Sequence, residues 1–391
     1  MIRVLHVIPS VAARYGGPST AVAAMCDALN RIDGVSAEIA TTDADGAGKY
    51  NPSTWTSPTP LHVFTVDGSA RMKAASGLRT WLHENLDRFD IVHTHSVWND
   101  PISAACQAAH RHTKPLVYRP CGMLSPYTWR NNLIVKRAYW LARERSNVKR
   151  AAVIHCTSEG EARDLRAYRA VRGRVEVIPN GVEGAAWTTP TNRDELRWRC
   201  GPRASGTPIV LFLSRLHPKK GLTEFLLPAM ARLSTSAFLA IAGGPDDHAP
   251  GYEAEVRDTI QRLGLADRTA LLGPVPPTQR WTLFDGADVF VLPSRSENFG
   301  IVIAEAMARG CPVLVTEGVQ ANEHVTRAGA GLVTPPTVEA VGTGLNQLLA
   351  DPATRSEMGS RGRTYASEHF NWDRIAGRLV ELYRMLARGT S

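Results

Sequence analysis

Short apolar runs recur along the chain, and longer stretches with apolar residues at helical spacing separate most of them. Seven runs in the first half have the composition of strands, and they cover residues 3–8, 35–41, 61–66, 91–95, 116–119, 153–157 and 175–178. Between the first two, residues 19–30 have the spacing of a helix. Strands that alternate with helices are typical of βαβ units, so the pattern predicts a parallel sheet.

The same pattern starts again after residue 205. Strands are expected at 209–214, 237–242, 269–272, 289–292, 312–315 and 331–333, with helices at 222–233, 252–263 and 301–309. The segment 184–205 before them holds a Thr-Thr-Pro-Thr-Asn stretch and a Gly-Pro pair, which are typical of a linker. The sequence therefore predicts two consecutive α/β domains, and it contains no internal repeat.

Composition agrees with this organisation. Of 391 residues, 43% are hydrophobic and 21% are charged, which is enough for two cores and excludes a disordered, collagen-like or disulfide-scaffold protein. The six cysteines form no C-x-x-C pair, so we expect free, buried thiols in a reducing compartment. No apolar run approaches the ~20 residues of a membrane span. The first eight residues resemble a strand more than a signal peptide, so the sequence predicts a cytoplasmic protein.

The formal net charge of +8 is concentrated in one part of the chain. Residues 111–174 hold 15 basic and 4 acidic side chains, a local net charge of +11, whereas residues 186–391 hold 22 and 21. Such a basic belt indicates a polyanionic partner, which is a phospholipid surface, a pyrophosphate-bearing substrate or nucleic acid.

Candidate chemistry lies at the ends of predicted strands, where open parallel sheets bind ligands. Gly16 and Gly17 follow the first strand and begin a helix, a pattern that suits a phosphate contact or a plain turn. Arg215 and Lys220 follow the strand at 209–214, and two cations of different reach suit a diphosphate. Glu297 and Glu305 lie eight positions apart around the start of a helix, where carboxylates and helix-end amides can bind sugar hydroxyls.

Taken together, these motifs resemble the retaining glycosyltransferases of the GT-B fold, closest to glycosyltransferase family 4. The resemblance covers nearly the whole chain and rests on motifs in the family's order: Gly16-Gly17, His93-Thr94-His95, Asn180-Gly181-Val182, Arg215 to Lys220, Gly243-Gly244, the E-x7-E from Glu297 to Glu305, and Phe370-Asn371-Trp372. It implies two Rossmann-like domains facing across a cleft. Residues 1–184 would bind the acceptor together with a returning C-terminal helix in 372–391, and residues 185–371 would bind a nucleotide-sugar donor.

The resemblance also implies a role for each matched position. Arg215 and Lys220 would hold the donor diphosphate, Gly16 and Gly17 would approach it, and Glu305 would bind the ribose. Further contacts are expected from Gly273 and Val275 to the base, from Glu297 with the amides of Asn298, Phe299, Gly300 and Ile301 to the transferred sugar, and from His95 to donor and acceptor. The implied mechanism is front-face attack with retention, in which the leaving phosphate oxygen helps to deprotonate the acceptor.

No cofactor and no essential metal are expected. Asp43-Ala44-Asp45 matches the D-x-D of metal-dependent transferases, but it lies in a polar segment that predicts a solvated turn. His93 and His95 have no third metal ligand close in sequence.

The basic belt contains a Gly-Met-Leu-x-Pro-x-x-Trp segment, ending at Trp129, that resembles family members building bacterial surface polysaccharides. A helix is expected at 133–149, with Ile134 and Leu141 on one face and Lys136, Arg143 and Arg150 on the other. The basic stripe is either a solvated face or a docking surface for an anionic membrane or a lipid-diphosphate acceptor, at the inner face of the membrane.

The leading hypothesis is a retaining hexosyltransferase that uses a UDP- or GDP-sugar and a saccharide acceptor, lipid-linked, in polysaccharide or glycan biosynthesis. A nucleotide-sugar epimerase or hydrolase of the same fold is one alternative, and a non-enzymatic basic-surface binding protein is another. Nucleic acid is not expected as a partner, because the sequence holds no recognised binding module. Donor base, sugar and acceptor are not readable from these motifs.

Overall fold

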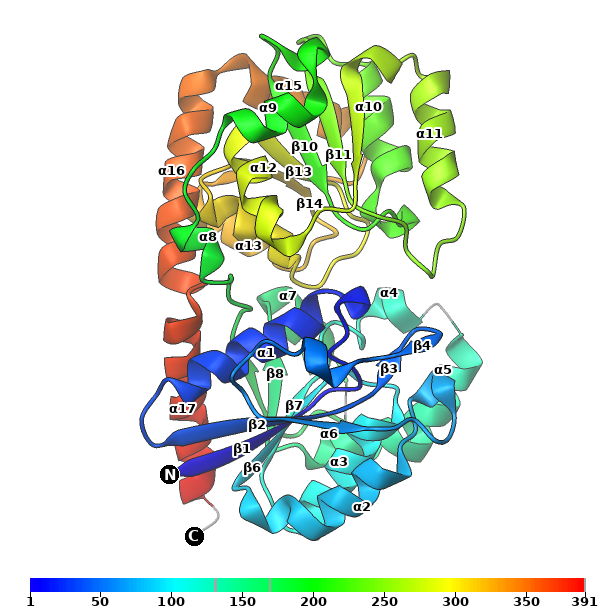
Figure 1. Ribbon diagram of the computed structural model, residues 1–391, viewed down its shortest axis with the longest axis vertical. Helices are drawn as coiled ribbons and strands as arrows, with labels where there is room; N and C mark the ends of the chain where they lie inside the picture. Colours follow the sequence, from blue (N-terminus) through cyan, green and yellow to red (C-terminus); the bar gives the residue numbers. More distant parts are fainter. Residues whose placement is uncertain (130–131, 169, 390–391) are drawn as a thin grey trace. The chain divides into compact units, whose positions relative to one another are not determined.

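The computed structural model describes residues 1–129, 132–168 and 170–389, and the chain divides into two compact units (Figure 1). Unit 1 comprises Met1–Gly181 and Trp372–Ser391, and unit 2 comprises Val182–Asn371. The division therefore falls between Gly181 and Val182, close to the expected position at 184–185.

Unit 1 is built on a seven-stranded parallel sheet in the order β5-β2-β1-β6-β7-β8-β9. Its strands are β1 (Ile2–Val7), β2 (Val35–Thr42), β5 (Leu61–Phe64), β6 (Ile91–His95), β7 (Leu116–Arg119), β8 (Val153–Cys156) and β9 (Arg174–Val177), with a small antiparallel hairpin of β3 (Ala44–Asp45) and β4 (Gly48–Lys49). The seven strands predicted from apolar runs are all present, with ends shifted by at most two residues.

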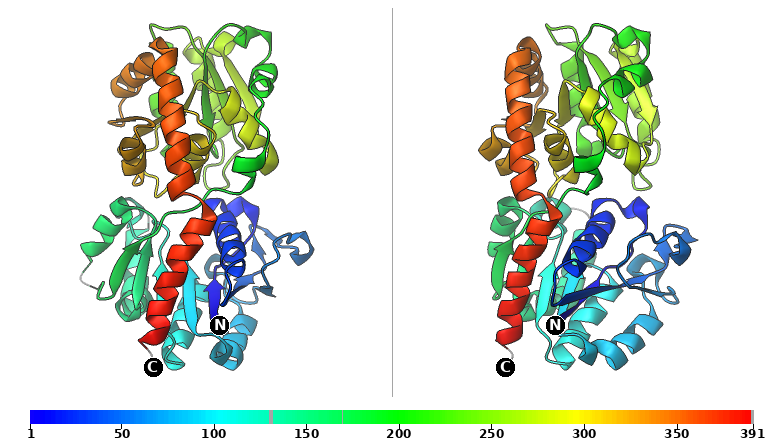
Figure 2. Two further views of the ribbon diagram at one scale, coloured as in Figure 1. Left: turned by 90° about the vertical axis from the view of Figure 1, so that its left-hand side faces the viewer. Right: turned by 60° about the vertical axis from the view of Figure 1, so that its left-hand side comes forward.

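Helices cover both faces of this sheet. Those of unit 1 are α1 (Gly17–Asn30), α2 (Ser76–Asn85), α3 (Asp100–Arg111), α4 (Pro126–Trp129), α5 (Leu133–Tyr139), α6 (Arg145–Arg150), α7 (Glu159–Arg166) and α17 (Trp372–Arg388). Helices α1 and α17 pack together on one face, and α2, α3 and α6 lie on the other (Figure 2). Helix α17 buries Leu379 and Tyr383 against β1, β6 and α1, so the end of the chain completes the core of unit 1.

Unit 2 repeats the architecture with a six-stranded parallel sheet in the order β12-β11-β10-β13-β14-β15. The strands are β10 (Ile209–Leu213), β11 (Phe238–Ala242), β12 (Thr269–Gly273), β13 (Val289–Leu292), β14 (Val313–Thr316) and β15 (Gly331–Thr334). Nearly all side chains of the central strands β11, β10, β13 and β14 are buried, as expected for a sheet covered on both faces, whereas most of those of the edge strands β12 and β15 are only partly buried. The two parallel sheets confirm the predicted α/β fold class.

The helices of unit 2 are α8 (Ala185–Thr188), α9 (Asp194–Cys200), α10 (Leu227–Ala231), α11 (Tyr252–Arg262), α12 (Arg280–Gly286), α13 (Ile301–Ala308), α14 (Asn322–Ala328), α15 (Val338–Ala350) and α16 (Pro352–His369). Helices α10 and α15 pack against each other on one face of the sheet, and α13, α14 and α16 pack on the other. No helix within the described ranges is long and apolar enough to cross a bilayer.

The helix predicted at 133–149 is present, and a π-helical turn at Trp140–Glu144 (η5) lies within it, between α5 and α6. The turn brings Glu144 into the core, where its carboxylate accepts hydrogen bonds from the Trp98 amide at 3.0 Å and from the Tyr118 hydroxyl. One extra residue in a turn changes the phase of a helix by about 100°. Val148 is therefore buried, whereas Ile134 and Leu141 are 84% and 72% exposed.

Candidate functional site

An ion pair between Lys220 and Glu297 lies at the carboxyl ends of β10 and β13. The loops that carry the two residues contact each other, since the amide of Arg295 donates to the Lys219 carbonyl at 2.8 Å. Gly221 makes this approach possible: its φ is 72°, and a Cβ there would lie 2.1 Å from the carbonyl oxygen of Pro293. The structure thus brings together two of the predicted site residues through backbone contacts.

The electrostatics of this pair keep Glu297 ionised. Burial raises the pKa of the Glu297 carboxyl, but the charge and hydrogen bond of Lys220, with Lys219 and Arg215 nearby, outweigh burial and lower it to about 2. Three cations therefore surround one carboxylate at this edge of the sheet. A site of this charge suits a polyanion such as a diphosphate.

Arg215, the third of these cations, forms its own ion pair with Asp246, at 2.7 Å between Nη1 and Oδ2. Asp246 is buried, which raises its pKa, but the His248 amide and the Arg215 charge outweigh this effect and lower it. The guanidinium of Arg215 remains 44% exposed. Asp246 was not predicted from the sequence, and it orients Arg215 without covering it.

The segment between Glu297 and α13 can contact a ligand through its backbone amides rather than through its side chains. Phe299 is buried and packs edge-to-face on Phe370, with ring centroids 5.6 Å apart. Gly300 has a φ of 69° and is the residue before the first turn of α13, which begins at Ile301. Because first-turn amides have no partner within their own helix, this segment can donate hydrogen bonds to a ligand.

Glu305 lies in the second turn of α13 and is almost completely buried. Nη2 of Arg280 is 3.2 Å from Oε1 of Glu305 and 2.8 Å from Oε1 of Glu183. Burial raises the pKa of Glu305 to about 7, with Arg280 opposing the rise and Glu183 adding to it. Sequence reasoning missed both residues: Arg280 follows no strand end, and Glu183 comes directly after the Asn180-Gly181-Val182 motif without being part of it.

The remaining predicted donor residues lie at the end of β12. Gly273 is its last residue, with a φ of 69°, and its carbonyl accepts from the Gly243 amide at 2.7 Å. Val275 is partly exposed two residues later. Their contact with a nucleotide base stays a prediction.

In unit 1, Gly16 and Gly17 stand where predicted, at the start of α1. Gly16 has a φ of 78° and precedes the helix, Gly17 is its first residue and Pro18 its second. Proline at this position adds no unsatisfied amide to those of the first turn. The geometry suits an anion at this helix end, and a phosphate contact stays a prediction.

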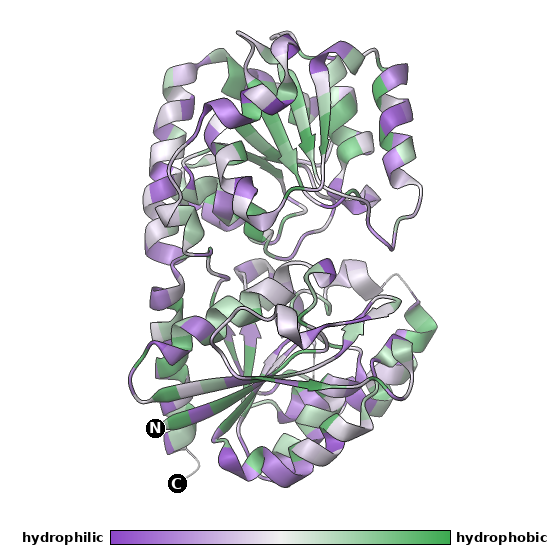
Figure 3. Ribbon diagram, in the orientation of Figure 1, coloured by the Kyte–Doolittle hydropathy of each residue, from purple (hydrophilic) through white to green (hydrophobic). Residues whose placement is uncertain are grey.

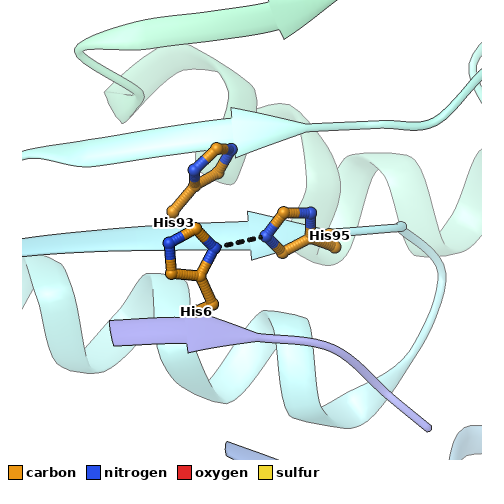
Figure 4. A group of neighbouring side chains, drawn as sticks. All are labelled: His6, His93 and His95. Carbon is orange, nitrogen blue, oxygen red and sulfur yellow. Dashed lines mark hydrogen bonds between the residues drawn. The ribbon is translucent and has the colours of Figure 1, made fainter. Parts of the chain in front are cut away.

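His95 is fully buried, and both of its ring nitrogens contact other side chains of unit 1. Its Nε2 lies 2.9 Å from Nδ1 of His6 (Figure 4). Its Nδ1 lies 3.3 Å from Nη1 of Arg119. His93 packs beside them and bonds to the Tyr383 hydroxyl at 2.7 Å. Sequence reasoning missed His6 and Arg119, which come from the neighbouring strands β1 and β7.

His6, His93 and His95 form a group whose nitrogens approach one another closely enough to hold a metal ion. His93 and His95 use both ring nitrogens in hydrogen bonds, whereas Nε2 of His6 has no partner among the described residues, and the nearby Arg119 charge opposes a further cation. The prediction for the D-x-D match at Asp43-Ala44-Asp45, the other possible metal site, is wrong for Asp43. Asp43 is not in a solvated turn: it is buried, accepts a hydrogen bond from the Val66 amide at 2.7 Å and pairs with Lys49.

Comparison with known protein families gives a family match for each of the two units. Residues 192–365 match the family described as "Glycosyl transferases group 1", and residues 16–181 match the "Glycosyl transferase 4-like domain". A D-inositol 3-phosphate glycosyltransferase of Xylanimonas cellulosilytica is 30% identical over 335 residues, which are 79% of this chain and 75% of that protein. A GDP-mannose-dependent alpha-(1-6)-phosphatidylinositol monomannoside mannosyltransferase of Mycolicibacterium smegmatis is 33% identical over 223 residues, 53% of this chain and 56% of that protein.

Among solved structures, Anabaena HepE in complex with UDP and glucose has a TM-score of 0.79 at 23% sequence identity. The match covers 98% of this chain and 100% of that one. Similarity at this level of identity establishes a shared fold across both units.

Proposed function

Because this chain belongs to the glycosyltransferases of the GT-B fold, similar to family 4, we propose that it transfers a hexose from a nucleotide sugar to a saccharide acceptor with retention of configuration. The observation that carries the proposal is the contact of Lys220 with Glu297, beside Arg215, at the carboxyl edge of the sheet of unit 2. A UDP- or GDP-sugar has the diphosphate, ribose and hexose that this set of groups can bind.

In the proposed donor complex, each charged group has a separate task. Arg215 and Lys220 bind the diphosphate and neutralise the charge that grows on it as the bond to the sugar breaks. Glu297 accepts hydrogen bonds from sugar hydroxyls, and the amides of Phe299, Gly300 and Ile301 donate to the same sugar. Glu305 accepts hydrogen bonds from the ribose hydroxyls. These groups are already held by the protein, so little reorganisation is needed during the reaction.

The proposed step breaks the bond between the sugar C1 and the phosphate oxygen and forms a bond from C1 to an acceptor oxygen on the same face. The acceptor proton goes to the leaving phosphate oxygen, so no protein nucleophile takes part and no metal or cofactor is required. His95 is proposed to orient a hydroxyl in the donor complex, where its Nε2 would exchange its contact with Nδ1 of His6 for the substrate.

The acceptor is proposed to be lipid-linked, and the enzyme to work in polysaccharide or glycan biosynthesis at the cytoplasmic face of a membrane. Support comes from the α5–α6 surface, which we define by four exposed apolar and five exposed basic side chains: Leu133, Ile134, Val135, Leu141, Arg137, Arg143, Arg145, Lys149 and Arg150. Figure 3 shows α5 as a hydrophobic element at the edge of unit 1. The single acidic residue at 133–150, Glu144, is buried. Exposed apolar side chains among cations suit an anionic lipid surface.

The basic stripe predicted from the sequence differs from this surface at one position. Lys136 is only partly exposed, because its Nζ donates to the Thr128 carbonyl, whereas Arg143 and Arg150 are exposed. Ile134 and Leu141 were placed on the face opposite the stripe, and they are the most exposed apolar side chains of α5 and η5. The proposed membrane contact therefore combines charge with insertion of apolar side chains.

The proposed activity is tested by incubating the protein with a panel of UDP- and GDP-sugars and a saccharide acceptor mixture. Donor consumption by the wild type, with loss of at least about a hundredfold in Lys220→Ala, is expected. Arg257→Ala serves as a control, because Arg257 is an exposed arginine of α11 whose ion-pair partner among the described residues is Glu253 of the same helix. Equal rates in Lys220→Ala and the wild type would overturn the site assignment.

The membrane contact is tested by vesicle flotation with phosphatidylcholine alone and with added phosphatidylglycerol. The wild type is expected to float only with anionic vesicles. Ile134→Ser with Leu141→Ser, and Arg143→Glu with Arg150→Glu, should each weaken binding about tenfold or more. Arg232→Glu with Arg257→Glu makes the same charge change on exposed residues of unit 2, so an equal loss in this control would refute the α5–α6 surface.

A further inference from the structure

Arg119 is a buried cation without a carboxylate partner. It is the last residue of β7 and is 1% exposed, and no ion pair joins it to any of the residues that the structure describes. Its guanidinium donates to Nδ1 of His95 at 3.3 Å and to Oδ1 of Asn180. Burying a charge without a counter-charge is costly, so its hydrogen-bond partners must account for its position.

The chemistry of arginine determines the protonation of His95. A guanidinium can only donate hydrogen bonds, so Nδ1 of His95 must carry a lone pair. A neutral imidazole then has its proton on Nε2, which donates to Nδ1 of His6 at 2.9 Å. His6 accepts at Nδ1 and therefore also carries its proton on Nε2.

A second chain of hydrogen bonds lies beside the first. The carbonyl of Ile178 at its end determines which groups donate and which accept. The carbonyl of Ile178 can only accept, so His155 donates to it from Nε2 at 2.8 Å and accepts at Nδ1. His93 donates from Nε2 to that nitrogen at 3.2 Å and accepts at Nδ1 from the Tyr383 hydroxyl at 2.7 Å. All four histidines are thus Nε2–H tautomers, and the proton on Nε2 of His6 has no acceptor among the described residues.

The surroundings keep these rings neutral. Burial, followed by the charges of neighbouring groups including Arg119, lowers the pKa of His95 well below its usual value, and the same causes lower that of His6 to about 3. The titratable and charged groups around His95 come from five elements: His6 of β1, His93 of β6, Arg119 of β7, His155 of β8, and Tyr383 and Arg378 of α17. Without Arg119, Nδ1 of His95 loses the donor that fixes the direction of these hydrogen bonds. One of the causes that lower the pKa of His95 is lost as well.

We propose that Arg119 is a positioning residue that fixes His95 as a hydrogen-bond donor at Nε2 and excludes it as a general base. The only lone pair of His95 is at Nδ1 and is taken by Arg119, so the ring has no free site for an acceptor proton. This inference rests on the proposed function for its kinetic part, because it leaves deprotonation of the acceptor to the leaving phosphate oxygen. Its tautomer part stands independently of any activity.

The tautomers are measured on the full chain with ring-¹⁵N-labelled histidine, assigning His95 by its absence in His95→Gln. The wild type is expected to show pyrrole-type Nε2 and pyridine-type Nδ1, with no titration between about pH 5.5 and pH 8. Arg119→Met should give mixed tautomers, because Nδ1 of His95 loses its donor, while burial, the largest cause of the low pKa, still keeps the ring neutral. Arg119→Lys retains a donor for Nδ1 and should keep the wild-type tautomer, which also covers the case in which Arg119→Met does not fold.

Tyr383→Phe is the matched control, because it removes a donor from the second chain and leaves Arg119 in place. It should change the His93 signals and not those of His95. In the kinetic arm, kcat of Arg119→Met should fall about tenfold at constant KM, and that of Arg119→Lys should stay close to the wild-type value. A pyrrole-type Nδ1 on His95 in the wild type, or signals unchanged in Arg119→Met, would overturn the proposal. Absence of any transferase activity would instead refute the proposed function and leave the tautomer result standing.

Discussion

The contact between Arg280 and Glu305 predicts how donor binding depends on pH. Ribose hydroxyls need an ionised carboxylate that accepts two hydrogen bonds, and burial raises the pKa of Glu305 to about 7. At this value about a tenth of the carboxyl is ionised near pH 6 and about nine-tenths near pH 8. Because the ionised form binds, donor affinity should rise about tenfold over this interval as pH increases.

Replacing Arg280 by Met removes the positive charge 3.2 Å from Glu305. An opposite charge at such a distance lowers a carboxyl pKa by about 1–3 units, so its loss should raise the pKa of Glu305 to about 8–10. The affinity of Arg280→Met near pH 7.5 should therefore fall by between about threefold and about two-hundredfold, and it should recover as pH rises through the raised pKa. A purely structural loss would not recover with pH.

The assay is calorimetric titration with UDP-glucose, whose diphosphate is esterified at both ends and keeps a constant charge over this range. GDP-mannose replaces it if UDP-glucose does not bind. Glu305→Gln is the control for the ionising group and should bind weakly at all pH values. An affinity that is flat from about pH 6 to pH 8 in the wild type, or an identical pH profile in Arg280→Met, would refute the reasoning.

Three further outcomes follow from particular contacts. Tyr383→Phe should lower the free energy of unfolding by about 1–3 kcal/mol in urea titration, because Nδ1 of His93 loses its buried donor; no change would contradict the hydrogen bond. Gly221→Ala should lower the free energy of unfolding by more than about 1 kcal/mol, because φ is positive at this position and the added Cβ would clash with the Pro293 carbonyl. Thermal melting measures this loss. Dialysis against EDTA should leave donor turnover unchanged, and a loss that a divalent cation restores would refute the expectation of no essential metal.

The strands could be predicted from the sequence because buried parallel strands are short apolar runs with turn residues at their ends. The loop residues Lys220 and Glu297 could be predicted because both follow such runs. Their contact depends on Gly221, whose positive φ lets the two loops approach, and only the structure supplies that geometry.

Other parts of the candidate site had no local signal. His6 and His95 are 89 positions apart, and they meet only because β1 and β6 are neighbours in the sheet. Arg280 begins a helix that looks ordinary in sequence, and its contact with Glu305 depends on how α12 and α13 pack. The exposure of Ile134 and Leu141 results from a π-helical turn, which regular helical spacing cannot reveal.

The most direct test of the central claim measures transfer and donor binding together in the wild type and Glu297→Gln. This change keeps the shape of the side chain and removes the charge that faces Lys220. The account predicts that the wild type transfers a hexose from a nucleotide sugar with retention, seen by NMR of the anomeric proton. Glu297→Gln should lose at least about a hundredfold in kcat while still binding the free nucleotide diphosphate. Wild-type turnover in Glu297→Gln, or an inverted product, would contradict it.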